Sequence, residues 1–187
     1  MERIDVDRVM AIAAETFAQH GFTGVGMREV ARDCGVSLQT IYYYFGSKEK
    51  LFEAVCRDAY HRALSHISGG MDFEAPLEAQ IEQLGGRLYD LLTGDQTLFL
   101  LLRRDLIEGS NAQSEFHSRL QYDALMNIFK RVLSSRFDEG RVEQVAFTAS
   151  SFIFGYCEFA VITRAPEKLG ERRQELIVTL KKMIQGS

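Results

Sequence analysis

Apolar residues recur at three- and four-residue steps along almost the whole chain, and this spacing predicts an all-α protein. Only two prolines occur, Pro76 and Pro166, and no Asn-Gly or Asp-Gly turn separates alternating apolar and polar segments as it would in a hairpin. The pattern favours about nine helices, arranged as a small N-terminal helix-turn-helix domain of three helices and a larger C-terminal helical bundle.

Four helices are predicted in the first third of the chain, each bounded by a residue that suits a helix end. Gly21 closes the first helix, and Gly26 and Gly35 bound the second. Ser37 and Ser47 are good N-cap residues for the third and fourth helices. The predicted ranges are 5–20, 26–35, 37–46 and 47–66.

The pattern changes near residues 68–75, after which the predicted helices are longer and more apolar. This shift favours a small N-terminal module over 1–47 and a larger helical body over 48–187, with helix 48–66 as a connector. Gly94, Gly109 and Gly140 are expected at three of the later joints. The later helices are predicted at 76–93, 96–108, 113–136, 141–164 and 168–185.

The composition is that of an ordinary soluble globular protein, with 46% hydrophobic and 26% charged residues in 187. No apolar run approaches the roughly 18 uncharged residues that span a bilayer, and the first residues lack the apolar core of a signal peptide. We therefore expect a cytoplasmic protein with no membrane partner. The three cysteines lack metal spacing, and His61 and His66 are five residues apart, so we expect neither a metal nor a cofactor.

The stretch GVSLQTIYYYFGSK, residues 35–48, places four aromatic residues in succession on one short helix. Successive helical residues point about 100° apart, so these four rings cannot share a single buried face. Leu38, Ile41 and Phe45 define the inward face, whereas Gln39 and Tyr43 point away from it. Thr40 points almost as far from the inward face as they do. Tyr42 and Tyr44 lie at the two opposite edges of the inward face.

Two short helices joined by a glycine-containing turn are the sequence form of a helix-turn-helix, and the outward residues of the second helix suit DNA. Gln39 can read adenine, Thr40 can contact thymine, and tyrosine hydroxyls such as those of Tyr42 and Tyr43 can bind phosphates. Ser37 with the free N–H groups of the helix start, and Lys48 at the next helix, can each hold a further phosphate. The alternative is that the tyrosines are packing residues, which we favour for Tyr44 alone.

Charge adds little support for a nucleic-acid partner. The whole chain has a formal net charge of −4. Residues 27–50 carry four basic and three acidic side chains, a balance of only +1. A surface this poor in cations predicts a modest salt dependence of DNA binding for each subunit, which dimerisation would double.

The segment FAQHGFTGVGMREVARDCGVSLQTIYYYFGSKEKLFEAV resembles the DNA-binding domain of the TetR family of transcriptional regulators, over about the first 55 residues. The resemblance implies a homodimer that binds palindromic DNA through a helix-turn-helix domain over 1–47. It also implies that an effector-binding and dimerisation domain over 48–187 binds a small molecule and releases the DNA. Leu38 and Gly26 depart from the family pattern, in which these positions are more often polar. Arg28, Gln39, Thr40, Tyr42, Tyr43 and Lys48 fall where family members contact DNA.

Two of the later segments suit a dimer interface. The segment VEQVAFTASSFIFGYCEFAVIT is apolar on nearly every face, and its small residues would let a partner helix approach closely. The segment ERRQELIVTLKKMI carries one apolar stripe opposite its charges. Packing within a single chain is the alternative to dimerisation. The residues expected at the interface are Phe147, Ser151, Phe154, Gly155, Leu176 and Leu180.

Aromatic residues and methionines at helical spacing in the later segments are compatible with an effector site and with an ordinary core. Arg103, Arg104 and Glu158 interrupt apolar runs, and a buried charge needs a partner in the protein or on a ligand. If a ligand pairs with an arginine here, an amphipathic anion or acyl compound is expected. The candidate ligand-binding residues are Phe99, Arg103, Phe116, Tyr122, Met126, Phe152 and Tyr156.

Two other classes of function compete with a ligand-responsive repressor. An enzyme is disfavoured, because none of the GxGxxG, phosphate-loop, GxSxG or HExxH motifs occurs. A helical protein-interaction adaptor with a degenerate helix-turn-helix stays open, since the local positive charge is weak. Activator function is also compatible with the sequence, which does not encode the direction of regulation.

Overall fold

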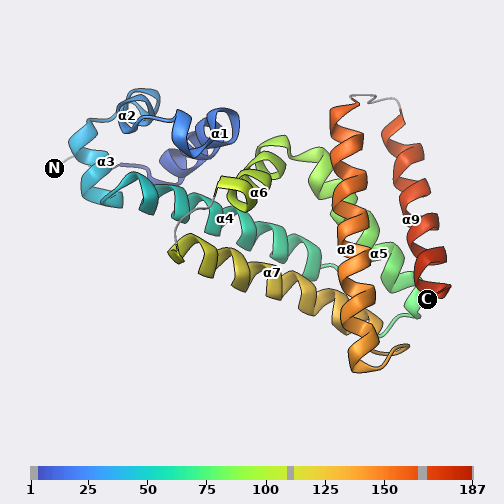
Figure 1. The fold of residues 1–187 in the computed structure, drawn as a ribbon. Coiled ribbons are helices and arrows are strands. Elements are labelled where there is room, and N and C mark those ends of the chain that lie inside the picture. Colours follow the sequence, from blue (N-terminus) through green and yellow to red (C-terminus); the bar gives the residue numbers. More distant parts are fainter. Residues whose placement is uncertain (1–3, 109–111, 164–167, 187) are drawn as a thin grey trace. The chain divides into compact units, whose positions relative to one another are not determined.

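The computed structural model describes residues 4–108, 112–163 and 168–186, with side chains for all of these outside 106–121. Within these residues the chain forms nine helices and no strand, which confirms the all-α prediction (Figure 1). The helices are α1 (Val6–Gly24), α2 (Met27–Cys34), α3 (Leu38–Phe45), α4 (Lys48–Ser68), α5 (Leu77–Gly94), α6 (Gln96–Glu108), α7 (Ala112–Leu133), α8 (Glu139–Ile162) and α9 (Leu169–Gln185).

Some of the predicted glycine positions coincide with helix ends and others do not. Gly35 and Gly46 directly follow α2 and α3, as predicted. Gly21 interrupts α1 with φ 72° and ψ 171°, after which one further turn runs to Gly24. The prediction that Gly140 lies at a joint was wrong, because Gly140 lies in the first turn of α8. The helix begins one residue earlier, where the Asp138 carboxylate accepts a hydrogen bond of 3.0 Å from the Arg141 N–H. Gly109 lies outside the described residues.

The chain divides into two compact units whose boundaries do not follow the order of the sequence. One unit comprises residues 1–62 and 96–119, so α6 packs with the helix-turn-helix. The other unit comprises residues 63–95 and 120–187. A functional division after residue 47 stays a prediction, since it concerns activities rather than packing.

The first unit has an aromatic core where α1 meets α4. The Phe17 and Phe52 rings pack edge to face with centroids 5.0 Å apart, and Phe22 lies 5.2 Å from Phe52. Edge-to-face pairs stabilise beyond their buried area, by about 0.5–1.5 kcal/mol each. Ile41 of α3 and Leu51 of α4 are fully buried in the same unit. The helix-turn-helix is thus fastened to α1 and α4 by apolar contacts.

The second unit is built on α5, α8 and α9, which pack against one another (Figure 1). Gly85 of α5 gives α9 a close approach, because a Cβ there would lie 3.0 Å from Leu180 and 3.4 Å from Leu176. Two ion pairs border this contact: Arg173 with Asp90 at 2.8 Å, and Lys181 with Glu82 at 2.6 Å. These ion pairs are largely exposed, so burial of leucine contributes more to stability than they do.

Among the described residues, α8 alone is long and apolar enough to cross a membrane by length and composition, with a mean hydropathy of 1.6. A helix packed in the interior of a soluble protein has the same composition. Part of α8 is buried in this way, since Ala146, Ile153 and Cys157 are fully enclosed.

Candidate nucleic-acid interface

The turn between α2 and α3 depends on a left-handed glycine. Gly35 has φ 69° and ψ 30°, and its N–H donates to the Arg32 carbonyl at 3.0 Å. The following N–H, of Val36, donates to the Ala31 carbonyl at 3.0 Å. These two bonds close α2 and redirect the chain into α3 within three residues. A side chain at position 35 would be strained, which is why glycine is needed there.

The start of α3 is fixed by a side-chain cap. The Ser37 hydroxyl accepts a hydrogen bond of 3.0 Å from the Thr40 N–H, and it lies 2.7 Å from the Thr40 hydroxyl. A serine cap stabilises a helix by about 1 kcal/mol. Ile41 alone among the eight residues of α3 is fully buried, whereas Leu38 and Phe45 are half-buried. The inward face is therefore narrower than predicted and is centred on one side chain.

The outward face of α3 carries polar and aromatic side chains that no part of the described chain covers. Tyr43 is 66% exposed, and Gln39 and Tyr42 are also exposed, whereas Thr40 is half-buried. Tyr44, which we expected to pack, is exposed as well and makes an edge contact with Tyr43 at 5.4 Å between ring centroids. Tyr43 and Tyr44 thus form an exposed aromatic pair, and Tyr42 and Gln39 are exposed on the same helix.

Lys48 is held in place by an aromatic ring. Its Nζ lies 4.5 Å from the centroid of the Phe22 ring, at a distance where cation–π attraction is favourable. Ser47 caps α4 by accepting from the Lys50 N–H at 3.2 Å, and a hydrogen bond from Ser47 lowers the pKa of Glu49 below its ordinary value. A charge that the fold positions in this way loses less freedom on meeting a phosphate.

The other basic residues of this surface differ in their surroundings. Arg28 of α2 is exposed. The Arg32 guanidinium lies 2.9 Å from Asp33 and 3.7 Å from Glu29, so its charge is locally balanced. Arg28 and Lys48 stay our predicted phosphate-binding residues beside α3.

The candidate effector residues do not form a single group. Phe99 and Arg103 belong to the first unit, where Phe99 is buried and Arg103 is exposed. The side chain of Phe116 lies outside the described residues. Met126 and the exposed Tyr122 line a cavity of about 390 Å³ in the second unit.

The remaining two candidates lie together at the junction of α8 and α9. Phe152 and Tyr156 have ring centroids 5.8 Å apart, and the Tyr156 hydroxyl donates to Glu175 at 3.0 Å. Sequence reasoning missed Tyr89 of α5, whose ring centroid lies 6.5 Å from that of Tyr156. Tyr89 is fully buried, and its hydroxyl has no hydrogen-bond partner among the described residues. In the sequence Tyr89 is one member of an apolar helical stripe, which gave no signal of a polar role.

The arginines that interrupt the apolar run of α6 differ from expectation. Arg103 is exposed rather than buried. The half-buried Arg104 donates to backbone carbonyls, from Nε to Ala18 at 2.8 Å and from Nη2 to Gln19 at 3.0 Å. Asp105 is the buried charge of this run, and it accepts a hydrogen bond from Tyr60. The pKa of Tyr60 is raised by burial and by the nearby Asp105 carboxylate.

The expected interface residues divide between exposed and buried positions. Phe147 and Ser151 are exposed, and Phe154 and Gly155 are half-buried on the same face of α8. Leu176 and Leu180 were wrongly assigned to an interface, because they are 0% and 1% exposed in the single chain, where they pack on α5.

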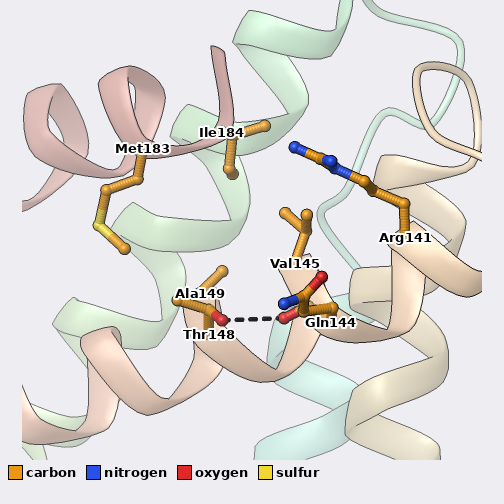
Figure 2. Close-up of a pocket in the computed structure, with 7 residues that line it drawn as sticks. All are labelled: Arg141, Gln144, Val145, Thr148, Ala149, Met183 and Ile184. Carbon is orange, nitrogen blue, oxygen red and sulfur yellow. Dashed lines mark hydrogen bonds between the residues drawn. The ribbon is translucent and has the colours of Figure 1, made fainter. Parts of the chain in front are cut away.

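Three exposed apolar residues of α8 and α9 were missed, namely Phe159 (72% exposed), Ile162 and Val178. A cavity of about 240 Å³ lies between α8 and α9 in the same unit (Figure 2). The Thr148 hydroxyl in its wall donates to the Gln144 carbonyl at 2.9 Å. The lining residues are Arg141, Gln144, Val145, Thr148, Ala149, Met183 and Ile184.

Comparison with known proteins identifies relatives of the helix-turn-helix. Residues 9–55 match the model of the tetR family of bacterial regulatory proteins. The chain is 23% identical over 145 residues to the uncharacterized HTH-type transcriptional regulator YerO of Bacillus subtilis, covering 75% of this chain and 49% of YerO. It is 37% identical over 71 residues to the HTH-type transcriptional regulator RutR of Escherichia coli, covering 38% of this chain and 34% of RutR. The matched stretches thus span half or less of these relatives.

Solved structures share the fold over nearly the full length. A transcriptional regulator from Rhodococcus sp. Rha1 has a TM-score of 0.82 at 18% identity, covering 96% of each chain. The regulator FadR from Bacillus subtilis, solved in complex with stearoyl-CoA, has a TM-score of 0.78 at 18% identity, covering 94% of this chain and 97% of FadR. At such identities the likeness shows the fold alone. These relatives are transcription regulators rather than enzymes.

Proposed function

Because the chain belongs through its N-terminal domain to the TetR family of transcriptional regulators, we propose that it is a dimeric repressor that binds inverted-repeat operator DNA. The observation that carries the proposal is the outward face of α3. Gln39, Tyr42 and Tyr43 are exposed together on a helix whose opposite side is anchored by the buried Ile41. A protein seldom exposes rings side by side unless they meet a partner.

The residues of this face have distinct roles in the proposal. Gln39 donates and accepts at the edge of an adenine, and Thr40 contacts a thymine methyl group. Tyr42 and Tyr43 donate their hydroxyls to phosphates on the two sides of the major groove. Arg28, Ser37 and Lys48 hold further phosphates, which fixes the position of α3 along the DNA.

Dimerisation places two such helices on successive major grooves of an inverted repeat. We propose that the exposed face of α8 forms the contact, because it carries Phe147, Ser151, Phe154 and Gly155 with Phe159 beside them. Large apolar side chains exposed along one helix mark an interaction surface. A symmetric contact would bury this face against its own copy.

We also propose that a small-molecule effector binds the C-terminal part of the chain and releases the DNA. Phe152 and Tyr156, with the buried hydroxyl of Tyr89 nearby, supply aromatic surface and a hydrogen-bonding group. An amphipathic acyl compound suits such a mixture. Acyl-CoA compounds are the first to screen, since the similarly folded FadR was solved with stearoyl-CoA.

The test is selection of bound DNA from a random pool by the purified protein at low salt. Recovery of an inverted repeat supports the proposal. The Gln39→Ala and Tyr43→Ala variants should each bind that repeat about 5- to 150-fold more weakly, which corresponds to about 1–3 kcal/mol for a lost base or phosphate contact. The matched control is Gln174→Ala, which removes an exposed side chain of the same type as Gln39 outside the helix-turn-helix.

Two results would contradict the proposal. An equal loss in the Gln174→Ala control would show that α3 is not the surface that contacts the bases. Recovery of no DNA by a folded dimer would favour the adaptor function, for which the shortage of basic residues around α3 is the supporting observation.

A further inference from the structure

An arginine of α6 holds the end of the helix that precedes the helix-turn-helix. Arg104 donates two hydrogen bonds, at 2.8 Å to the Ala18 carbonyl and at 3.0 Å to the Gln19 carbonyl. Gly21 interrupts the helical hydrogen bonds just after these residues, with φ 72° and ψ 171°. Carbonyls in the last turn before such a break need partners from outside the helix, and the negative end of the helix dipole favours a cation. Arg104 therefore acts as a C-terminal cap supplied by a distant helix.

The turn that Arg104 holds is followed by Phe22, and the Phe22 ring contacts the Lys48 side chain. Phe22 follows Gly21 and packs on Phe52, with ring centroids 5.2 Å apart. The Phe22 ring also carries the Lys48 ammonium group, at 4.5 Å from the ring centroid to Nζ. The place of the Lys48 charge therefore depends on where the end of α1 lies.

The residue after Arg104 fastens α6 to a second helix. Asp105 is buried and accepts a hydrogen bond from Tyr60 of α4. Two consecutive residues of α6 thus hold α1 and α4, and all three helices contribute to one compact unit. A displacement of α6 must break these bonds or move both helices with it.

We propose that Arg104 is a positioning residue for DNA binding: by capping α1 it fixes Phe22, and through Phe22 it fixes the Lys48 charge beside the recognition helix. The link from Arg104 to α1 stands on its own, whereas its effect on DNA rests on the proposed function.

The first experiment measures amide hydrogen exchange in the Arg104→Gln variant, with Arg57→Gln, at an exposed arginine of the same unit, as the matched control. Exchange in residues 17–25 should become about tenfold faster or more in Arg104→Gln, because charge-assisted hydrogen bonds that oppose local opening are lost. Arg57→Gln should leave these amides unchanged. Arg104→Lys should restore part of the protection, since an ammonium group can still donate to a carbonyl. Unchanged exchange in a folded Arg104→Gln variant would overturn the proposal.

The second experiment is a double-mutant cycle on the inverted repeat recovered by selection. Arg104→Gln and Lys48→Met should each weaken binding about tenfold and reduce the salt dependence, and the double variant should bind little worse than either. If the fold-loss of DNA affinity in the double variant equals the product of the two single losses, Arg104 does not act through Lys48, and the proposal is overturned. If selection recovers no DNA, the proposed function fails, and the exchange measurement still decides whether Arg104 caps α1.

Discussion

Ile41 is the position where one substitution should detach the recognition helix from its unit. Ile41 is 0% exposed and is the one fully buried residue of the eight in α3. Truncating a buried isoleucine to alanine costs about 2–5 kcal/mol, through lost transfer free energy and the cavity left behind. An isolated helix of eight residues is unstable in water, since helices shorter than about 12–15 residues are marginal. Ile41→Ala should therefore free α3 as well as destabilise the fold.

The assay is urea unfolding followed by circular dichroism, combined with hydrogen exchange of the α3 amides. Ile41→Val removes one methyl group and should cost about 0.5–1.5 kcal/mol, which calibrates the series. Val6→Ala in α1 is the control, because Val6 is exposed and its truncation should change stability by less than about 0.5 kcal/mol. A loss in Ile41→Ala no larger than that in Val6→Ala would refute the argument that one side chain anchors α3.

Three further predictions test other parts of the structure. Gly155→Ala should stabilise the single chain by about 1 kcal/mol, because nothing lies within 4 Å of a Cβ there, and should weaken self-association in sedimentation if α8 forms the dimer contact. Gly35→Ala should lower the free energy of unfolding by about 1–2 kcal/mol in urea titrations, because its φ of 69° is strained for alanine, and a neutral result would contradict the turn geometry. Burial raises the pKa of the Cys157 thiol from 9.0 to about 12, so its stabilising contribution is fully present below pH 9 and is lost as the pH rises from 9 to 12. Cys157→Ala should flatten the pH dependence of unfolding over that range, and an unchanged slope would show that Cys157 does not cause it.

The local features of the fold followed directly from the sequence. The 3.6-residue spacing of apolar positions, with the glycines and serines at the ends, predicted most helices to within a few residues. Gly35 and Ser37 predicted the turn and the start of α3, because both act on backbone groups only a few residues away. Stepping around the helix also placed Gln39 and Tyr43 outward without any knowledge of other helices.

Which partner each side chain of an apolar segment contacts, and whether that side chain is buried, did not follow from the sequence. Leu176 and Leu180 form a stripe that would suit either a partner chain or the core, and only the approach of Gly85 in α5 decided for the core. Arg103 and Arg104 are neighbours of the same type, yet Arg103 is exposed whereas Arg104 donates to carbonyls near the end of α1. Such outcomes depend on residues more than 80 positions away, and a single sequence carries no record of those distances.

By itself, then, the sequence determined the all-α fold, the helix-turn-helix and the outward face of α3, because helix periodicity and capping act over a few residues. Only the tertiary structure decided that α6 packs with the helix-turn-helix and that Arg104 caps α1. It also decided that Lys48 lies on the Phe22 ring. These contacts arise when helices far apart in the chain are packed together, since packing selects partners by shape and distance, which no local pattern contains.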